Sequence, residues 1–256
     1  MTTTEDFARS FNAVAAQYAA ARPTYPPALY DAVEELAGRP FAGAAVADVG
    51  AGTGIGTRPM HERGARVVAV EPGPGMGAEL RRRLPGVTLV RASGDALPFA
   101  PGTFDLVTYA QSWHWTTPAR SIPEALRVLR PGGSLALWWN VADRTAPWAV
   151  AQLERLERRL PAYRRRSVTT LAPGLIRELD PALSPVYREL TWSRTIPLAA
   201  HVAALATHSP FAVLPPEESA PILADEAEAL SVDFPDGQVE ERYTVRLTIV
   251  GRPPIG

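Results

Sequence analysis

Apolar residues in the first part of the chain recur at helical spacing. In residues 5–21 the apolar positions lie one, three or four residues apart: Phe7, Phe11, Val14, Ala15 and Tyr18. This spacing predicts an amphipathic helix that ends before Pro23. Residues 27–36 repeat the pattern, with Pro27 in a first turn that tolerates proline, so a second helix is expected there.

From residue 41 the pattern changes to short β-branched runs that alternate with helix-like stretches. The strand-like runs are AAVADVG, ARVVAVE, VTLVRA, FDLVTYA and GSLALWWN, and helix-like stretches between them include MGAELRRRL and IPEALRVL. Nearly continuous apolar strands separated by helices are typical of a parallel sheet covered on both faces. Residues 41–140 are therefore predicted to form a doubly wound α/β core, which binds its ligand at the carboxyl ends of the strands.

Beyond residue 140 the alternation stops. Residues 141–183 are punctuated by proline and mostly helical in pattern, which predicts a helical cap or lid. Residues 184–256 contain the strand-like segments VYRELTWSRTI and RYTVRLTIV, with helical segments between them, and are expected to complete the sheet and a substrate pocket. With residues 1–40 as N-terminal helices that close over the ligand, the chain is predicted to have four parts.

Composition narrows the classes of function. The chain has 256 residues, of which 46% are hydrophobic, and its formal net charge of -1 provides no basic field for a nucleic-acid partner. The absence of cysteine excludes disulfides, thiolate nucleophiles and cysteine metal sites. The acidic, non-hydrophobic start and the lack of any apolar stretch of membrane-spanning length predict a cytoplasmic protein with no membrane partner.

The strongest chemical signal is DVGAGTG at residues 48–54. Gly50, Gly52 and Gly54 follow an apolar run directly, and glycines let a backbone approach a ligand where a Cβ would obstruct it. A nucleotide-like ligand is therefore expected, and a tight turn without a ligand is the alternative. Ile55 stands where the dinucleotide fingerprint has its third glycine, which disfavours an oxidoreductase that uses nicotinamide cofactors.

Two acidic residues follow later strands. Glu71 ends the second strand-like run, and a carboxylate about 20 residues beyond such glycines can accept hydrogen bonds from both hydroxyls of a ribose. Asp95 follows the third run in SGDALPF, where its carboxylate and the backbone of Ala96 could face the amino edge of an adenine. Taken singly, Glu71 is more typical of a solvated loop residue, and Asp95 of an ordinary turn or helix-cap residue, but the spacing of Glu71 from the glycines favours the ribose contact.

Five segments together resemble a known family. DVGAGTG, VVAVEP, SGDALPF, FDLVTYAQSWHW and RVLRPGGSLAL occur in the order found in class I S-adenosylmethionine-dependent methyltransferases, a resemblance that covers most of residues 10–140. The pieces AAQYAAARPTYP, EPGPGM and AQSWHW resemble the small-molecule, menaquinone-methyltransferase-like branch, also described as type 11. The resemblance implies a Rossmann-like, mostly parallel seven-stranded sheet. It also implies S-adenosylmethionine as cofactor, S-adenosylhomocysteine as product, and methyl transfer to an O, N or C atom of a small organic acceptor.

The resemblance also assigns contacts with the cofactor. It places the first-strand acid and the glycines at the methionine portion, Glu71 at the ribose and Asp95 at the adenine. The two N-terminal residues are expected to close over the cofactor, where a guanidinium can pair with its carboxylate. The cofactor-binding candidates are Tyr18, Arg22, Asp48, Gly50, Gly52, Gly54, Glu71, Pro72, Asp95, Ala96 and Gln111.

Two positions depart from the family pattern. Gly73 stands where an acidic or polar residue is common, and Gly77 stands where a longer side chain is common, so a looser adenine side is expected. Because a fold does not fix a reaction, an alternative stays open. In it the protein binds S-adenosylmethionine or S-adenosylhomocysteine but has a regulatory role or a non-methylating activity of the cyclase or lyase type.

The catalytic candidate is His114, after the fourth strand-like run. Displacement at a sulfonium methyl needs a nucleophile held about 3 to 3.5 Å from the methyl carbon, and a base is needed only if the acceptor is protonated. Histidine, with an ordinary pKa of about 6.5, suits that role. Alternatively, His114 packs between Trp113 and Trp115 and shapes the pocket. The substrate-pocket candidates are Trp113, Trp115 and His208.

Other features carry less weight. Arg164, Arg165 and Arg166 are interpreted as a solvated face of the cap. His201 and His208 have no metal-ligand spacing with other histidines or acids, so no metal site is predicted. A monomer or homodimer with a small-molecule acceptor is expected.

Overall fold

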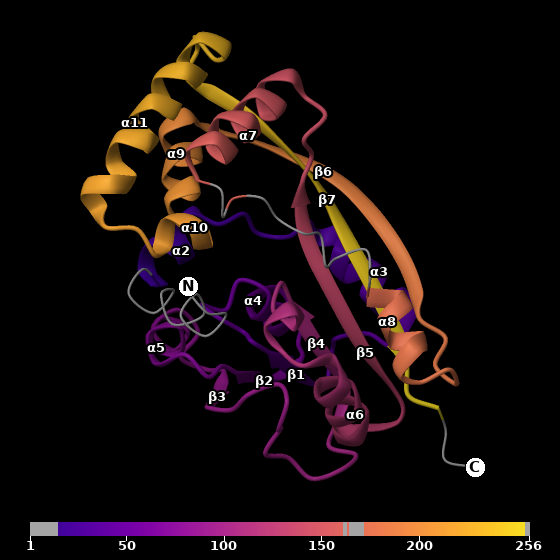
Figure 1. The fold of residues 1–256 in the computed structure, drawn as a ribbon. Coiled ribbons are helices and arrows are strands. Elements are labelled where there is room, and N and C mark those ends of the chain that lie inside the picture. The colour runs from indigo at the N-terminus through magenta and orange to yellow at the C-terminus, as the bar shows by residue number, and fades with distance from the viewer. Residues whose placement is uncertain (1–14, 161–162, 164–171, 254–256) are drawn as a thin grey trace. The chain divides into compact units, whose positions relative to one another are not determined.

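The computed structural model describes residues 15–160, 163 and 172–253 of the chain (Figure 1). Its strands form one mixed seven-stranded sheet in the order β3-β2-β1-β4-β5-β7-β6, with β7 antiparallel. The strands are β1 (Ala45–Val49), β2 (Arg66–Val70), β3 (Thr88–Val90), β4 (Phe104–Ala110), β5 (Leu129–Ala142), β6 (Val186–Pro197) and β7 (Gln238–Gly251). This topology confirms the predicted doubly wound, mostly parallel seven-stranded sheet.

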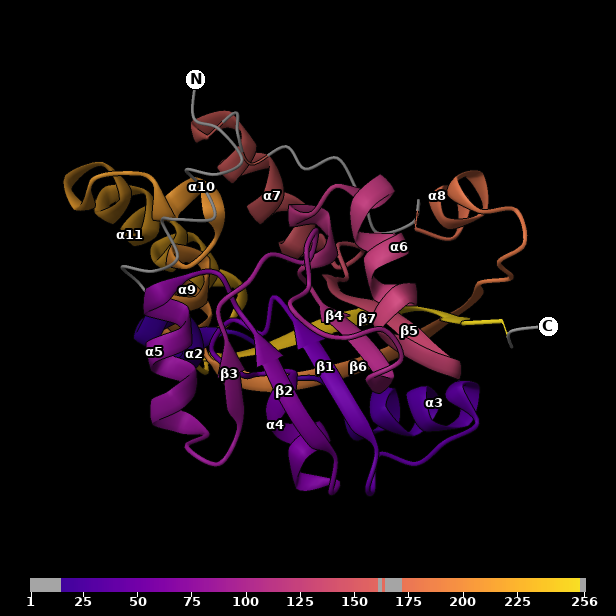
Figure 2. The same cartoon turned by 90° about the horizontal axis from the view of Figure 1, so that it is seen from below.

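Register brings the carboxyl ends of the central strands to one edge. Asp48 of β1 lies opposite Ala69 of β2 and Thr108 of β4, and all of these pairings are parallel. Figure 2 shows β3, β2, β1 and β4 side by side with their arrowheads at the same edge. The loops that follow these strands therefore lie together, as the alternation of strands and helices predicts.

Prolines start many of the helices. The helices are α2 (Ala15–Ala21), α3 (Pro27–Ala37), α4 (Thr57–Glu62), α5 (Pro74–Arg83), α6 (Pro118–Val128), α7 (Pro147–Arg159), α8 (Ala172–Leu179), α9 (Leu198–Ala206), α10 (Ser209–Ala212) and α11 (Pro216–Asp233), with a short 3₁₀ turn, η1, at Trp113–Trp115. A proline in the first turn removes only an N–H that has no partner within the helix, so it favours these starts. None of the described helices is both long and apolar enough to cross a membrane.

The chain divides into two compact units built from separate segments. One unit comprises residues 24–140, 167–190 and 245–256, and it carries β1 to β4, α3 to α6 and α8. We call it the sheet unit. The other comprises residues 1–23, 141–166 and 191–244, and it carries α2, α7 and α9 to α11. We call it the helical unit; the long strands β5, β6 and β7 contribute residues to both.

The core of the sheet unit is formed by its strands. Val46, Ala47, Val107 and Leu135 are fully buried, as is Trp138 of β5. The near-continuous burial of β1 and β4 explains why their sequences read as unbroken apolar runs. β5 begins four residues before the predicted run, at Leu129, because an irregular register between Phe104 and Leu106 lets the Pro-Gly-Gly segment join the strand.

The helical unit has its own core and a buried polar network. Leu156, Leu160, Tyr163, Leu205, Phe211 and Ile222 form its apolar cluster. Beside α9, the Nδ1 of His201 lies 2.6 Å from Glu241 Oε1 and its Nε2 lies 3.0 Å from Gln152 Nε2. The described part of the first predicted helix is α2; Phe7, Phe11 and Val14 lie outside the described residues.

Candidate cofactor site

The glycine loop follows β1 and bends through left-handed backbone conformations. Gly50, Gly52 and Gly54 have φ angles of 68°, 56° and 86°, which residues with a side chain rarely adopt. A Cβ on Gly50 would lie 2.4 Å from the Cβ of Ser112, and one on Gly54 would lie 2.8 Å from Leu84 Cδ1. A Cβ on Gly52 would meet no described atom within 4 Å. Packing therefore requires two of these glycines, whereas at Gly52 the protein itself leaves room for a side chain.

Glu71 ties the end of β2 to that loop. Its Oε2 accepts a hydrogen bond of 2.9 Å from the backbone N–H of Gly52, and its Oε1 accepts one of 2.7 Å from Gly73. Burial raises the pKa of this carboxyl, and the two N–H groups act in the opposite direction. Each carboxylate oxygen can accept a second hydrogen bond, so the group keeps capacity for two ribose hydroxyls.

Asp48 lies beneath the loop and is engaged by the protein. Its side chain is fully buried, and its two oxygens accept hydrogen bonds of 2.6 Å from Thr57 Oγ1 and 2.9 Å from Thr108 Oγ1. Burial raises the pKa of Asp48 to about 6, while the two hydroxyl groups act to lower it. In this arrangement Asp48 joins β1 to α4 and β4, which holds the loop above it.

This buried carboxyl predicts a pH dependence of stability. The folded pKa of about 6 lies above the ordinary value of 3.8, so the folded state holds the proton more tightly than the unfolded chain. The contribution of Asp48 to the free energy of unfolding is therefore full below about pH 4 and is lost as pH rises to about 6, a change on the order of 2 to 3 kcal/mol.

Chemical denaturation of the wild type and of Asp48→Asn at several pH values checks this. We expect the stability of the variant to increase relative to the wild type between about pH 4 and pH 6 and then to level off. Asparagine keeps one acceptor for a threonine hydroxyl, so the variant should fold. A stability difference that does not change with pH would contradict the assignment.

The segment after β4 contains an unusual backbone conformation. Gln111 has a φ of 60°, the only positive value at a residue other than glycine among the described residues. Its backbone N–H donates to Trp138 O at 2.9 Å and its Nε2 donates to Asn140 O at 3.4 Å. Strain of this kind is concentrated at binding sites in proteins, and here β5 holds it in place. The amide side chain of Gln111 thus lies between the ends of β4 and β5.

His114 belongs to η1 and is hydrogen-bonded through one ring nitrogen. The indole Nε1–H of Trp139 donates to His114 Nδ1 at 3.2 Å, and the ring of Trp115 lies 4.8 Å away. With Nδ1 acting as an acceptor, the neutral ring carries its proton on Nε2. To take a proton at Nδ1, His114 must give up the indole contact. Trp113 is 3% exposed and donates its own indole N–H to Ser121, so it supports η1 from behind.

The candidate adenine residues lie in the loop between β3 and β4. Asp95 Oδ1 accepts a hydrogen bond of 2.9 Å from the backbone N–H of Thr117, the residue that precedes α6. Ala96 is exposed, and its N–H donates to Ser93 O at 3.2 Å. Asp95 therefore anchors the residue that precedes α6, and its side chain is partly exposed.

The two departures from the family pattern have local explanations. Gly73 precedes α5, and its N–H donates one of the two backbone hydrogen bonds that Glu71 accepts. A Cβ on Gly77 would lie 3.0 Å from Leu89 Cδ2, so α5 approaches β3 too closely for a long side chain without a shift. Gly77 thus reflects packing of a helix on a strand.

The remaining candidates belong to the helical unit. Arg22 Nη2 donates to Thr207 O at 3.0 Å, and its guanidinium lies 4.9 Å from the centre of the Tyr18 ring. His208 Nδ1 lies 2.5 Å from the hydroxyl oxygen of Tyr163. Their roles toward cofactor and acceptor stay predictions. Arg164, Arg165 and Arg166 lie outside the described residues, and the described residues contain no group of three or more potential metal-binding side chains.

Several residues that shape the site did not emerge from the sequence. Thr57 and Thr108 hold Asp48, and Ser112 Oγ donates to Val49 O at 2.5 Å against the glycine loop. A polar residue inside an apolar strand, such as Thr108 in FDLVTYA, is a signal that could have been used. Thr57 starts α4 and Ser112 follows β4, and polar residues are common at such places, so these two carry no such signal.

The site has the groups that a nucleoside cofactor with an amino-acid tail requires. Glu71 offers two acceptors for a ribose, Asp95 offers a carboxylate to a base, and the Cβ position of Gly52 is open. In addition, Thr53 Oγ1 in the glycine loop is buried and has no hydrogen-bond partner among the residues that the structure describes. Buried hydroxyls are usually satisfied, so this one is available to a polar group of a ligand.

Comparisons with known proteins agree with this geometry. A family model described as "Methyltransferase domain" matches residues 47–137. An uncharacterized methyltransferase of Mycobacterium bovis is 43% identical over 143 residues, which are 56% of this chain and 57% of that protein. A demethylmenaquinone methyltransferase of Beutenbergia cavernae is 40% identical over 119 residues, 46% of this chain and 47% of its own length. The chain thus matches about half the length of these curated relatives.

A solved structure extends the likeness beyond the matched segment. A proposed type II methyltransferase from Anaeromyxobacter dehalogenans superposes with a TM-score of 0.71 at 26% identity, covering 91% of this chain and 99% of that one. The glycine loop and the acid after β2 lie within residues 47–137, whereas β6 and β7, which complete the sheet, lie beyond them. Residues 47–137, which lie within the sheet unit, therefore match a methyltransferase domain and resemble the class I S-adenosylmethionine-dependent methyltransferases.

Proposed function

We propose that the protein transfers a methyl group from S-adenosylmethionine to an O, N or C atom of a small organic acceptor. The observation that carries this is Glu71, whose carboxylate is bound to the glycine loop through Gly52 and keeps acceptor capacity for a ribose. S-adenosylmethionine supplies the electrophilic methyl group, on a sulfonium sulfur. The protein's residues need to hold the cofactor and bring the acceptor into line.

In this proposal each part of the sheet unit has a separate task. Glu71, with Pro72 beside it, binds the ribose hydroxyls, and Asp95 with Ala96 binds the adenine edge. The glycine loop, supported by Asp48, lies against the methionine portion. From the helical unit, Tyr18 and Arg22 close over the cofactor and His208 lines the acceptor pocket. The four-part division of the chain, with residues 141–183 as a cap, belongs to the same proposal.

His114 has a positioning role in this proposal. Its Nδ1 accepts the Trp139 indole N–H, which holds the ring next to Trp115, so the exposed imidazole forms a wall beside the acceptor. Rate then comes mainly from proximity and alignment, which can contribute about 7 to 11 kcal/mol to lowering a barrier. An acceptor that loses its proton before it binds needs no base from the protein.

Substitution of His114 separates the two roles. If the ring shapes the pocket, His114→Phe keeps a flat ring and should retain kcat within about threefold, whereas His114→Ala should raise the acceptor KM. If the ring is a base, both variants should lose about 10²- to 10⁴-fold in kcat. Steady-state kinetics with saturating cofactor distinguish these results, and a large kcat loss in the phenylalanine variant would refute the positioning role.

The proposed function itself is tested by following the methyl group. The protein is incubated with methyl-labelled S-adenosylmethionine and a metabolite extract, and the small-molecule, protein and nucleic-acid fractions are separated. We expect label in the small-molecule fraction together with S-adenosylhomocysteine in equal amount. Label confined to protein or nucleic acid would overturn the acceptor class. Cofactor binding without any transfer would support the non-methylating alternative.

A further inference from the structure

The loop that carries Asp95 depends on side chains for its hydrogen bonds. Between β3 and β4 its regular structure, within the described residues, is an isolated bridge between Ser93 and Ala96. Backbone N–H and C=O groups that lie outside a ladder must find other partners if they are buried. Leu97 is such a residue, because it is 4% exposed and directly follows the candidate adenine contacts.

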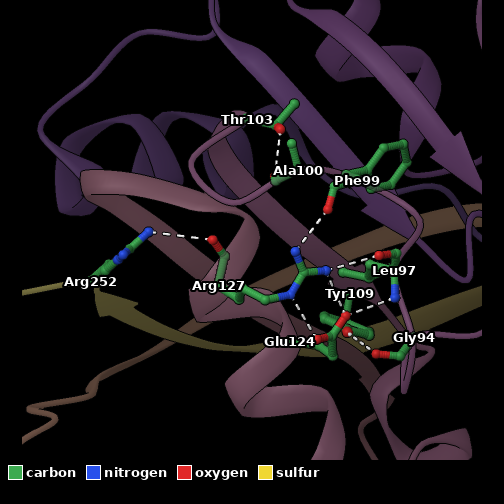
Figure 3. A network of polar contacts seen from close by, with 9 residues as sticks. All are labelled: Gly94, Leu97, Phe99, Ala100, Thr103, Tyr109, Glu124, Arg127 and Arg252. Carbon is green, nitrogen blue, oxygen red and sulfur yellow. Dashed lines mark hydrogen bonds and ion pairs between the residues drawn. The ribbon is translucent and has the colours of Figure 1, made fainter.

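An ion pair on α6 satisfies both backbone groups of Leu97. Glu124 Oε2 accepts the N–H of Leu97 at 2.9 Å, and Arg127 Nη2 donates to the C=O of Leu97 at 2.9 Å (Figure 3). The two side chains bind each other, with Arg127 Nε 2.8 Å from Glu124 Oε1. Arg127 Nη1 also donates to Phe99 O at 2.8 Å. The pair therefore supplies the hydrogen-bond acceptor and donor that the backbone of a neighbouring strand would supply in a sheet.

The other side of Asp95 is anchored as well. The hydroxyl of Tyr109 donates to Gly94 O at 3.3 Å, and Asp95 itself accepts the N–H of Thr117. A Cβ on Gly94 would lie 3.0 Å from side-chain atoms of Val49 and Thr116, so the backbone fits closely there. Asp95 and Ala96 thus lie between two residues whose backbone is anchored, Gly94 before them and Leu97 after them.

Arg127 is in turn held by the backbone around it. Its C=O accepts hydrogen bonds from Gly102 N at 3.0 Å and from Arg252 Nη1 at 3.4 Å, and Figure 3 shows Arg252 on the far side of Arg127 from the loop. The guanidinium beside Glu124 lowers the pKa of that carboxyl, so the pair stays ionised near neutral pH. The planar guanidinium of Arg127 binds two backbone carbonyls and one carboxylate, so this side chain has little freedom to move.

We propose that the Glu124–Arg127 pair is a positioning device for the adenine of the cofactor. The inference rests on the proposed function, in which Asp95 recognises the amino edge of the base. The pair touches no ligand and acts through Leu97, which it fixes two residues beyond Asp95. Since a recognition group works only when its support holds it in place, loss of the pair weakens recognition of the base more than binding of the remaining cofactor.

The test compares two ligands that differ at the adenine amino group. Calorimetry measures the binding of S-adenosylhomocysteine and of S-inosylhomocysteine, which has a carbonyl in place of that amino group. In Arg127→Met and Glu124→Gln we expect affinity for S-adenosylhomocysteine to fall about tenfold, the loss of one well-placed hydrogen bond. Affinity for S-inosylhomocysteine should change by less than about threefold, because it lacks the group that Asp95 recognises.

A matched pair on another helix provides the control. Arg82 and Glu79 on α5 have the same spacing and a contact of 2.7 Å, but neither bonds to the loop after β3. Arg82→Met should leave both affinities unchanged. Adding Asp95→Ala to Arg127→Met should cost little more than either change alone, because both act on one recognition group.

Each other outcome overturns the positioning role. Unchanged affinity for S-adenosylhomocysteine in the folded variants would do so, and so would an equal loss for both ligands, which indicates general damage to the fold. If Arg127→Met does not fold, Glu124→Gln carries the same test because it keeps the size of the side chain. A wild type that binds neither ligand would overturn the proposed function and this inference with it, whereas a failure confined to the variants overturns this inference alone.

Discussion

Replacing Glu71 with alanine should lower the affinity for S-adenosylhomocysteine at least tenfold. The carboxylate is expected to accept charge-assisted hydrogen bonds from the ribose, each worth roughly 1.5 to 3 kcal/mol. Its loss also frees the N–H groups of Gly52 and Gly73, so the glycine loop loses an anchor in the same variant. Calorimetric titration of the variant, with folding checked by circular dichroism, measures the effect.

Two further variants make the Glu71 result specific. Glu71→Gln keeps the shape but sets an NH₂ group against one of two backbone donors, so it should also lose at least tenfold. Glu62→Ala removes an exposed carboxylate of α4, 3.7 Å from Arg58, and should have no effect on binding. Wild-type affinity in folded Glu71→Ala would refute the assignment of the ribose to this residue.

Gly52→Val should abolish cofactor binding while the protein stays folded. The Cβ position of Gly52 meets no described atom within 4 Å, so a branched side chain there meets the ligand before it meets the protein. A valine at the left-handed φ of 56° will lower the free energy of unfolding by about 1 to 2 kcal/mol, whether or not the cofactor binds there. Binding is measured by calorimetry and stability by thermal denaturation.

Gly43→Val separates the effect of strain from that of obstruction. Gly43 has a φ of 76° and equally open surroundings, but it precedes β1, at the opposite end of that strand from the glycine loop. The two variants should lose similar stability, and only Gly52→Val should lose binding. Retained affinity in Gly52→Val would mean that this glycine serves only to form the turn.

Most of the fold could be predicted from hydrophobic patterning. Strands buried on both faces, such as β1 and β4, give apolar runs that local sequence reveals, and prolines such as Pro27 and Pro118 mark where helices start. The start of β5 was harder to predict, because its Pro-Gly-Gly segment resembles a turn and lies at an irregularity in the register between β4 and β5, where its backbone hydrogen bonds go to Arg252. Pairing between distant segments leaves no local trace.

The candidate site was predictable where a residue's type and spacing carry the chemistry. The glycines and Glu71 are of this kind, and the structure ties Glu71 to Gly52 by a hydrogen bond. The contact of His114 with Trp139 and the ion pair of Arg127 with Glu124 were not predictable in their consequences. Each depends on which atoms a folded backbone brings together, and a sequence pattern specifies no atoms.

A crystal structure of the protein with S-adenosylhomocysteine tests the central claim most directly. We expect the two ribose hydroxyls within hydrogen-bonding distance of the Glu71 carboxylate, with the Cβ position of Gly52 facing the ligand and the adenine amino group at Asp95. A ligand bound elsewhere, or a ribose turned away from Glu71, would contradict it.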